Sequence, residues 1–437
     1  MRRTYFIHAL VLTVVLAACQ RSASRTPTAS PVPEATQSAT PPAEVSVTPS
    51  PEPIHTEATH VPAELPPAPP TPSSAPIAHF SPGTEITLTY IHMIDATHGW
   101  AIGRRGQGEA HVFSTADGAD TWRDVTPPQP RSEDPLRAAG YFADLERAWV
   151  LYFEAPAAPR PMPGEVMALI VWRTQDGGAT WAASTPVGVE FIGSGGAPVF
   201  QFIDSENGWL LAKFGGSGMH RYPVYLLASE DGGQTWFAQE EPYSGEYLQG
   251  CLKTGMAFST GQTGVATISN CPVDGAFTLW TDDGGWTWQD FVLPLPADGP
   301  TEWFGVYCET HSPAWLSAEQ GLVAADCRWT EGDHPRDGSW IYLTPDSGAT
   351  WGSRSYPGGP VLFLDASRGW ALGRDIHWTA DGGRTWRLVK TVAWDGQFSF
   401  VDEDLGWAVA RSEDDIALVR TRNGGETWLI VEPTVGN

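Results

Sequence analysis

Seven carboxyl or amide side chains recur at one position of an eight-residue pattern, so their type and spacing could support chemistry. Each copy has a hydroxyl residue, the acid or amide two places later, a glycine-rich pair and a closing Thr-Trp, as in Thr174 to Trp181. The recurring side chains are Asp117, Asp176, Asp231, Asp283, Asp346, Asp381 and Asn423. Carboxylates could act as general acids or bases, or bind calcium. They could equally close their own turns, because Asp accepts backbone N–H groups and glycine adopts positive φ.

Cysteine and histidine offer a second kind of chemistry. Two Cys and two His lie within a short span and could bind zinc, namely Cys308, His311, Cys327 and His334. Their spacing does not match a common zinc module, and the parallel pair Cys251 and Cys271 has no histidines beside it. Four cysteines beyond Cys19 are also what two disulfides in an exported protein require.

A second pattern precedes each eight-residue copy and shows which elements must position these residues. It is clearest in Phe202 to Trp209 and Phe363 to Trp370, and it reads as strand, tight turn and strand. Two hairpins per repeat make four antiparallel strands, A to D. Seven such units predict an all-β chain forming a seven-bladed β-propeller. Acids spaced around a ring and engaged in their own turns are predicted to be structural.

The eight-residue turn resembles the Asp-box, or bacterial neuraminidase repeat. Together with the Gly-Trp strand, it resembles the propellers of photosystem II stability and assembly factors and their bacterial relatives, over about residues 85 to 433. Ala119, Ser347 and Asn423 depart from the Asp-box pattern without putting the turn in doubt. The resemblance implies the fold and a scaffold or assembly role. It does not imply a reaction, since sialidases, xyloglucanases and sorting receptors also contain Asp-boxes.

The meander places both repeated turns on one face and the B–C and D–A connections on the other. Length varies only at the second face, which we call the long-loop face, and binding usually resides in long loops on a rigid scaffold. Its loops include Pro294 to Pro313 and Asp326 to Ser339. Candidate binding residues are Tyr222, Tyr243, Tyr247, Trp303, Phe304, Tyr307, Trp329 and Glu331.

The strand register predicts which cysteines would pair in disulfides. Cys251 and Cys308 each lie 13 residues before the glycine that begins their B strand, and Cys271 and Cys327 lie 7 and 6 residues after it. Both pairs therefore join the start of strand A to the end of strand B. We predict Cys251–Cys271 and Cys308–Cys327, with no metal and no cofactor.

The N-terminus predicts export and a lipid anchor. Residues 1–18 read as a signal peptide, and the small residues directly before Cys19 resemble a lipoprotein cleavage site, which makes Cys19 the lipidated residue. Residues 19–80 are rich in Pro, Thr and Ser and predict a disordered linker, followed by the propeller over 81–437. The expected location is extracytoplasmic, on a bacterial membrane. The net charge of −25 opposes binding to nucleic acid.

The sequence favours a non-catalytic propeller that binds a protein partner or a glycan through the long-loop face. The alternative is a glycoside hydrolase, sialidase-like or other, that uses acids of the same face. A sialidase carries a Phe/Tyr-Arg-Ile-Pro motif on its first blade and has six units, whereas this chain has neither that motif nor six units. The chain also contains no Gly-x-Ser-x-Gly, no His-Glu-x-x-His and no phosphate loop.

Overall fold

The computed structural model describes residues 62, 64–68, 75–132, 135–154, 166–190, 197–213, 224–240, 250–269, 271, 273–413 and 415–436. All of them belong to one unit, Thr59–Asn437. Every regular element in this described part is a β-strand. No helix within it is long and apolar enough to cross a bilayer. Cys19, the predicted signal peptide and most of the predicted linker lie outside the described residues.

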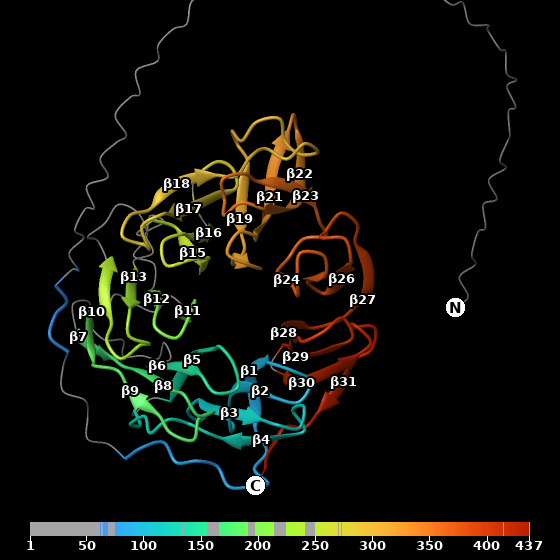
Figure 1. The fold of residues 1–437 in the computed structure, drawn as a ribbon. Helices are drawn as coiled ribbons and strands as arrows, with labels where there is room; N and C mark the ends of the chain where they lie inside the picture. Colours follow the sequence, from blue (N-terminus) through green and yellow to red (C-terminus); the bar gives the residue numbers. More distant parts are fainter. Residues whose placement is uncertain are drawn as a thin grey trace, which may run out of the picture. The chain divides into compact units, whose positions relative to one another are not determined.

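Seven antiparallel sheets follow one another around a central opening, which confirms the predicted seven-bladed propeller (Figure 1). The strands of the first three blades, from the opening to the rim, are β1 (Thr87–Met93), β2 (Gly99–Arg104), β3 (His111–Thr115) and β4 (Thr121–Asp124); β5 (Leu136–Phe142), β6 (Ala148–Glu154), β8 (Val171–Thr174) and β9 (Ala182–Ala183); and β11 (Val199–Phe202), β12 (Gly208–Lys213), β13 (Val224–Ser229) and β14 (Phe237–Glu240).

The other four blades repeat the same order. Their strands are β15 (Leu252–Phe258), β16 (Gly264–Ser269), β17 (Phe277–Thr281) and β18 (Gln289–Val292); β19 (Tyr307–Thr310), β21 (Gly321–Glu331), β22 (His334–Thr344) and β23 (Gly352–Ser355); β24 (Val361–Phe363), β25 (Gly369–Leu372), β26 (Asp375–Thr379) and β27 (Arg387–Thr391); and β28 (Asp395–Phe400), β29 (Leu405–Ser412), β30 (Asp415–Arg422) and β31 (Leu429–Val431).

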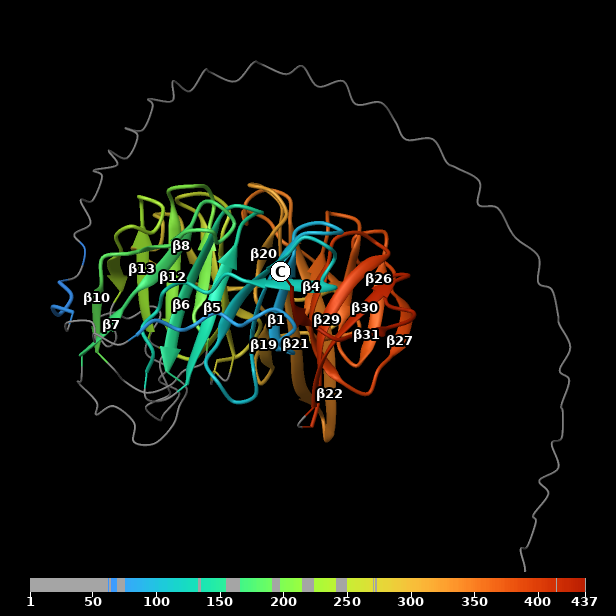
Figure 2. The ribbon, with the colours of Figure 1, turned by 90° about the horizontal axis from the view of Figure 1, so that it is seen from below.

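The second and fifth blades contain additional strands. In the second blade, β7 (Val166–Leu169) and β10 (Val187–Glu190) form a separate two-stranded sheet. In the fifth blade, β20 (Ala314–Trp315) pairs with the beginning of β21, and β22 extends beyond the other labelled strands on one side of the ring (Figure 2).

The prediction that Asp326 to Ser339 forms a loop is wrong, because this segment is the end of the β21–β22 hairpin. The ladder continues to the pair Glu331 and His334. A tight turn at Gly332, with a φ of 60°, makes this possible, since glycine adopts positive φ without steric cost.

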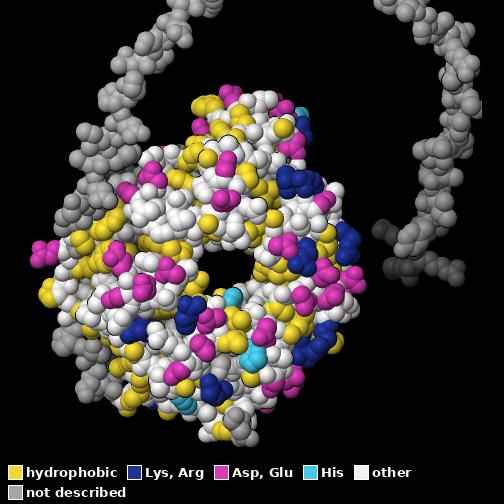
Figure 3. All heavy atoms as spheres, in the orientation of Figure 1, with side chains coloured by type: hydrophobic (Ala, Val, Ile, Leu, Met, Phe, Trp, Pro, Cys, Tyr) yellow, Lys and Arg dark blue, Asp and Glu magenta, His cyan; other side chains and the backbone are white. Residues whose placement is uncertain are grey.

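The ring closes between the seventh and first blades through the C-terminus. Strand β32 (Thr434–Val435) pairs in parallel with β4 and adds a fifth strand to the rim of the first blade. On the inner side, the amide of Gln397 in β28 exchanges two hydrogen bonds with the backbone of Ile91 in β1, at 2.8 and 2.9 Å. The central opening remains open when all atoms are drawn (Figure 3).

The apolar core lies between neighbouring blades, and the Gly-Trp pattern builds it. Trp209 of the third blade stacks on Phe258 of the fourth with 3.8 Å between ring centroids, and Trp149 stacks on Phe202 of the third blade at 3.8 Å. The glycine before the tryptophan is required by packing, since a Cβ at Gly208 would lie 2.4 Å from the ring of Phe202. Both partners are buried, so each blade is held by its neighbours rather than by a core of its own.

A segment upstream of the first blade packs on its rim, and we call residues 75–86 the strap. Ile77 is 3% exposed and its N–H donates to Gln129 O at 2.9 Å. Phe80 stacks on His111 with 3.9 Å between centroids, and its N–H donates to Asp124 at 2.8 Å. The predicted boundary at residue 81 therefore falls within a packed segment.

Candidate functional site

The seven recurring acid or amide side chains close their own turns. In every copy, the threonine four residues later donates its backbone N–H to Oδ1 at 2.8–2.9 Å. In the six Asp turns, the hydroxyl of that threonine donates to Oδ2 at 2.6–2.7 Å. Asn423 accepts this hydroxyl on Oδ1 instead, at 3.1 Å, because its amide nitrogen is not an acceptor.

These bonds favour the ionised form of the acids. Burial raises the pKa of Asp231, but bonds from the Thr235 hydroxyl and N–H outweigh it and lower the pKa below its ordinary value. The N–H and hydroxyl of Thr385 lower the pKa of Asp381 to about 2. Acids held ionised in this way are unsuited to donate a proton near neutral pH. No group of three or more metal-ligating side chains occurs among the described residues.

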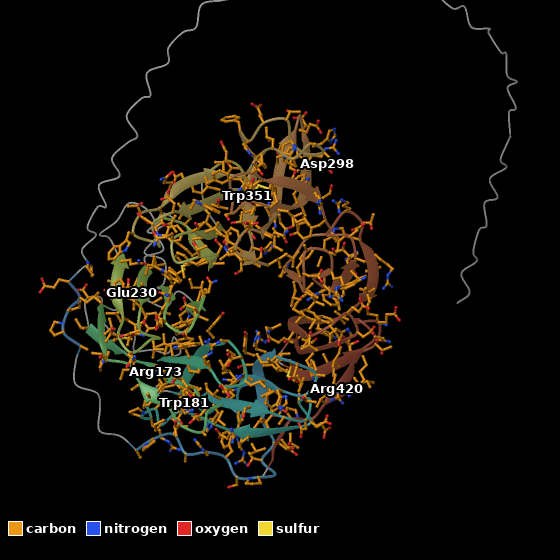
Figure 4. The ribbon with its side chains drawn as sticks, in the orientation of Figure 1. Arg173, Trp181, Glu230, Asp298, Trp351 and Arg420 are labelled. Atoms are coloured by element: carbon orange, nitrogen blue, oxygen red, sulfur yellow. A yellow bond between two sulfur atoms is a disulfide. The ribbon has the colours of Figure 1, made fainter. Side chains whose placement is uncertain are left out.

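The same turns also connect each blade to its neighbours. Trp149 of the second blade donates Nε1–H to Gly232 O of the third at 2.8 Å, and Trp407 of the seventh donates to Gly118 O of the first at 3.2 Å. Arg420 reaches across the same seventh-to-first boundary, with Nη1 at 3.1 Å from Gly118 O and 2.8 Å from Asp120 Oδ1 (Figure 4). We call this side of the ring the turn face.

The A–B turns of the turn face share a side-chain capping arrangement that was not predicted from the sequence. Each begins with an Asp, Ser or Thr whose side-chain oxygen accepts the N–H groups two and three residues later, as Asp365 does from Ser367 and Arg368 at 2.8 Å each. The N–H at the fourth position of every eight-residue turn then donates to a carbonyl of this A–B turn at 2.7–3.0 Å. The residue types were visible in the sequence, since Asp, Ser and Thr favour such turns. The pairing of the two turns was not.

Ala119 and Ser347 confirm that the turn tolerates departures from the pattern. They take φ values of 73° and 56°, where most other copies have glycine. Their turns keep the same hydrogen bonds, including Ala119 N–H to the Thr115 hydroxyl at 3.1 Å and Gly348 N–H to the Thr344 hydroxyl at 2.7 Å.

Both predicted disulfides are present, at the end of the blades opposite the turn face. Cys251 is bonded to Cys271 and Cys308 to Cys327, with Cα–Cα distances of 5.0 and 4.0 Å. Cys308 and Cys327 are register partners on β19 and β21. Zinc binding by these two cysteines is thereby excluded, and His311 Nε2 lies 2.7 Å from Asp326 Oδ2.

The candidate binding residues differ in what they offer to a ligand. Phe304 and Tyr307 are 82% and 58% exposed. Trp303 and Trp329 are partly buried in the cluster between the fourth and fifth blades. Glu331, near the tip of the hairpin, lies 3.0 Å from Arg336 Nε. The remaining three, Tyr222, Tyr243 and Tyr247, lie outside the described residues.

Trp303 holds the exposed aromatics in place. Its Nε1–H donates to Leu293 O at 3.0 Å, and its ring lies over Gly275, where a Cβ would be 2.9 Å away. Gly275 N–H in turn donates to Val306 O at 2.7 Å. The fourth-blade loop and the segment leading to Tyr307 are therefore fixed to each other, as is the hairpin behind them, where Trp340 Nε1–H donates to Asp298 Oδ1 at 2.9 Å (Figure 4).

A polar hollow of about 430 Å³ lies between the fifth and sixth blades on the long-loop face. Its walls are the ends of β21 and β22, the connection between the two blades and the turn between β25 and β26. The lining residues are Asp326, Cys327, Arg328, Asp337, Gly338, Ser339, Pro357, Gly358, Gly359, Gly373, Arg374 and Asp375. The segment from Asp326 to Ser339 was predicted to be a loop of this face, but no sequence pattern brings all of these residues together.

Asp326 is the most constrained group of the hollow. It accepts from Tyr356 OH at 3.1 Å and from Gly359 N–H at 3.3 Å, and His311 Nε2 lies 2.7 Å from it. Burial raises the pKa of Asp326, but the bonds from His311 and Ser339 outweigh it and lower the pKa to about 2. An ionised acceptor requires His311 to carry its proton on Nε2. The arrangement fixes side chains rather than preparing a proton donor.

The sequence matches no protein-family model. It also matches no curated protein. Solved structures with a similar fold include YCF48 from Cyanidioschyzon merolae, with 17% identity, a TM-score of 0.41, and coverage of 80% of this chain and 99% of that one. A PL25 ulvan lyase has 11% identity and a TM-score of 0.46, with coverage of 82% of this chain and 97% of the lyase. The GH93 α-L-arabinofuranosidase of Fusarium graminearum, in complex with arabinobiose, has 12% identity and a TM-score of 0.39, with coverage of 66% of this chain and 92% of the enzyme. Enzymes and YCF48 occur together in this set, so it assigns no activity to the chain.

Proposed function

We propose that this chain is a non-catalytic, extracytoplasmic propeller that is held to a bacterial membrane through a lipid on Cys19 and binds a protein partner or a glycan through its long-loop face. One observation carries the proposal. The acids that recur in the sequence are engaged in turns of one face, while exposed aromatics and a hollow occupy the other. Rigid scaffolds with variable loops at one end commonly bind there.

The turn geometry supports identifying the eight-residue repeat as an Asp-box with a structural role. Each Asp accepts bonds from its own threonine and hydroxyl residue, as Asp176 does from Thr174 and Thr180. A carboxylate with these partners has little capacity left for a substrate. The resemblance to photosystem II assembly factors adds the expectation of a scaffold role.

The long-loop face has the features of a preorganised binding surface. Phe304 and Tyr307 are exposed, yet the segment carrying them is fixed by the Trp303 contacts and by the disulfide between Cys308 and Cys327. A surface that is already ordered loses less conformational entropy on binding. Exposed aromatic side chains are also frequent binding hot spots.

One acid of the hollow, Asp326, does not suit the role of proton donor in glycoside hydrolysis. A hydrolase of this type needs one carboxylic acid with a raised pKa and a second carboxylate across the scissile bond. The pKa of Asp326 is lowered to about 2 instead, despite its burial. This group would therefore be ionised at neutral pH and could not protonate a leaving group.

The proposal is tested by site-specific photo-crosslinking of the full chain in its native membrane. A benzoylphenylalanine residue replaces either Phe304 on the long-loop face or Glu230, an exposed residue of a repeated turn (Figure 4). We expect adducts at position 304 and none at position 230, and their mass identifies the captured partner as protein or glycan. Adducts at position 230 alone would contradict the proposal. So would glycan turnover by the purified chain that is abolished by changing acids of the long-loop face.

A further inference from the structure

The hollow between the fifth and sixth blades is built by one face of the fifth blade. Side chains alternate along a strand, so Asp326 and Arg328 of β21 point to the same side. Their register partners on β22 are Ser339 and Asp337, and Tyr307 of β19 is the other partner of Arg328. The opposite face of this blade contacts the fourth blade through Val323, Ala325, Cys327, Trp329 and Trp340. One side of the β21–β22 hairpin thus belongs to the apolar core. The other side forms the polar wall of the hollow, and the ring of Tyr307 lies beside that wall.

The charges of the hollow select against highly charged ligands. Three carboxylates line it, those of Asp326, Asp337 and Asp375, together with the guanidinium groups of Arg328 and Arg374. Arg374 forms an ion pair with Asp395, with Nε 3.2 Å from Oδ1, while Arg328 forms no ion pair with any described residue. The carboxylates would repel a polyanion, and the guanidinium of Arg328 would repel a cation. A hydroxyl group both donates to carboxylates and accepts from guanidinium groups, so it suits this lining.

The ring of Tyr307 adds an apolar surface at the edge of the polar wall. It is 58% exposed and belongs to the register pair next to the Cys308–Cys327 disulfide. The disulfide links the strands that carry Tyr307 and Arg328, so the backbone positions of these two residues keep a fixed spacing. An aromatic ring beside fixed donors and acceptors can contact the C–H face and the hydroxyl groups of a sugar at the same time.

We infer that this hollow binds an uncharged oligosaccharide, with one sugar on Tyr307 and its hydroxyl groups directed to Arg328 and Asp337. The inference rests on the proposed function, because it names the ligand class of the same long-loop face. A volume of about 430 Å³ is within the range of small-molecule sites, so it holds a short stretch of the glycan and leaves the rest outside.

The glycines of the hollow allow it to be filled without disturbing the fold. The atoms nearest to a Cβ at Gly373 would be those of Asp375, at 3.9 Å, and Gly373 is not in the left-handed region. A Gly373→Phe substitution therefore places a ring at the hollow at little steric cost. The matched control is Gly261→Phe in an A–B turn of the turn face, where nothing lies within 4 Å of the added Cβ.

The experiment titrates the purified full chain with neutral hexasaccharides and with charged probes. The neutral set is cellohexaose, xylohexaose, mannohexaose, maltohexaose and N-acetylchitohexaose, and the charged set is hexagalacturonate and hexalysine. We expect at least one neutral hexasaccharide to bind, by isothermal titration or saturation-transfer NMR. Gly373→Phe and Tyr307→Ala should each weaken that binding about tenfold or more, as loss of a binding hot spot does, while Gly261→Phe leaves it unchanged.

The inference is overturned if no neutral hexasaccharide binds, if binding survives Gly373→Phe, or if only hexagalacturonate or hexalysine binds. These failures are distinguishable from failure of the proposed function. Protein adducts from position 304 together with no oligosaccharide binding would leave the binding face in place and remove the glycan. Absence of adducts at position 304, with adducts at position 230, would remove both.

Discussion

Replacing Asp231 should destabilise the propeller by an amount that its hydrogen bonds determine. Its Oδ1 accepts from the Ser229 hydroxyl at 3.0 Å and from the N–H groups of Gln234 and Thr235 at 2.9 Å each. Its Oδ2 accepts the Thr235 hydroxyl at 2.6 Å. Asp231→Ala removes all four bonds. In the natural Asn423 turn, Oδ1 accepts the Thr421 hydroxyl and both the N–H and the hydroxyl of Thr427, so Asp231→Asn should keep bonds of this kind on Oδ1 and lose the negative charge.

A hydrogen bond to a charged acceptor contributes up to about 2 kcal/mol, and less where solvent reaches the group, as it does here. We therefore expect Asp231→Asn to lower the free energy of unfolding by about 1 kcal/mol, and Asp231→Ala by about 3 kcal/mol. For a domain of about 350 residues, the entropy of unfolding converts these losses to about 1 and 4 °C in Tm. The assay is thermal and urea unfolding followed by tryptophan fluorescence.

The difference between wild type and Asp231→Asn should also depend on pH. Burial raises and the Thr235 bonds lower the pKa of Asp231, with a net decrease in the folded protein. A lowered pKa gives stability that is complete above the unfolded value, near 3.9, and is lost as the pH falls through the folded value. The two proteins should therefore differ at pH 7 and converge under more acidic conditions. Equal stability at pH 7, or a difference that grows in acid, would refute the structural role of this carboxylate.

Three further predictions follow from single features. Ser347→Gly should change the free energy of unfolding by less than about 1 kcal/mol in urea titrations, because relief of the φ of 56° at Ser347 is offset by loss of its hydroxyl bond to Ala318 O at 3.0 Å, and a loss of more than about 2 kcal/mol would contradict this. Replacing Cys251 and Cys271 together by Ser should cost about 3 kcal/mol, since their bond spans 20 residues, and the unmodified protein should show no reactive thiol from these cysteines in a thiol titration. Asp124→Asn should cost about 3 kcal/mol and expose the strap to limited proteolysis, because Asp124 and His111, 2.8 Å apart, are both buried; unchanged protease resistance would contradict this.

The sequence predicted the features whose geometry is local or periodic. An eight-residue turn is specified by its own residues, so seven copies predicted the number of blades and the strand order. The disulfides were predicted because position relative to Gly264 and Gly321 fixes where each cysteine falls relative to the strand ends.

The features that escaped prediction join residues that are distant in the chain. The hollow combines Asp326 with Gly358 and Arg374, which belong to different elements, and no local pattern records their proximity. The exposure of Trp303 also could not be read from its loop, because contact with Gly275 of another loop partly buries it. The rim position of β32 depends in the same way on β4, at the other end of the sequence.

The central claim is that the turn face maintains the fold and the long-loop face binds. It is tested most directly by measuring both the free energy of unfolding and the adduct yield at position 304 in two variants, Asp231→Asn and Gly373→Phe. We predict that Asp231→Asn lowers stability and leaves the adduct yield unchanged, and that Gly373→Phe leaves stability unchanged and lowers the yield. The reverse pattern, in which Asp231→Asn abolishes adducts without loss of stability while Gly373→Phe has no effect on them, would contradict the claim.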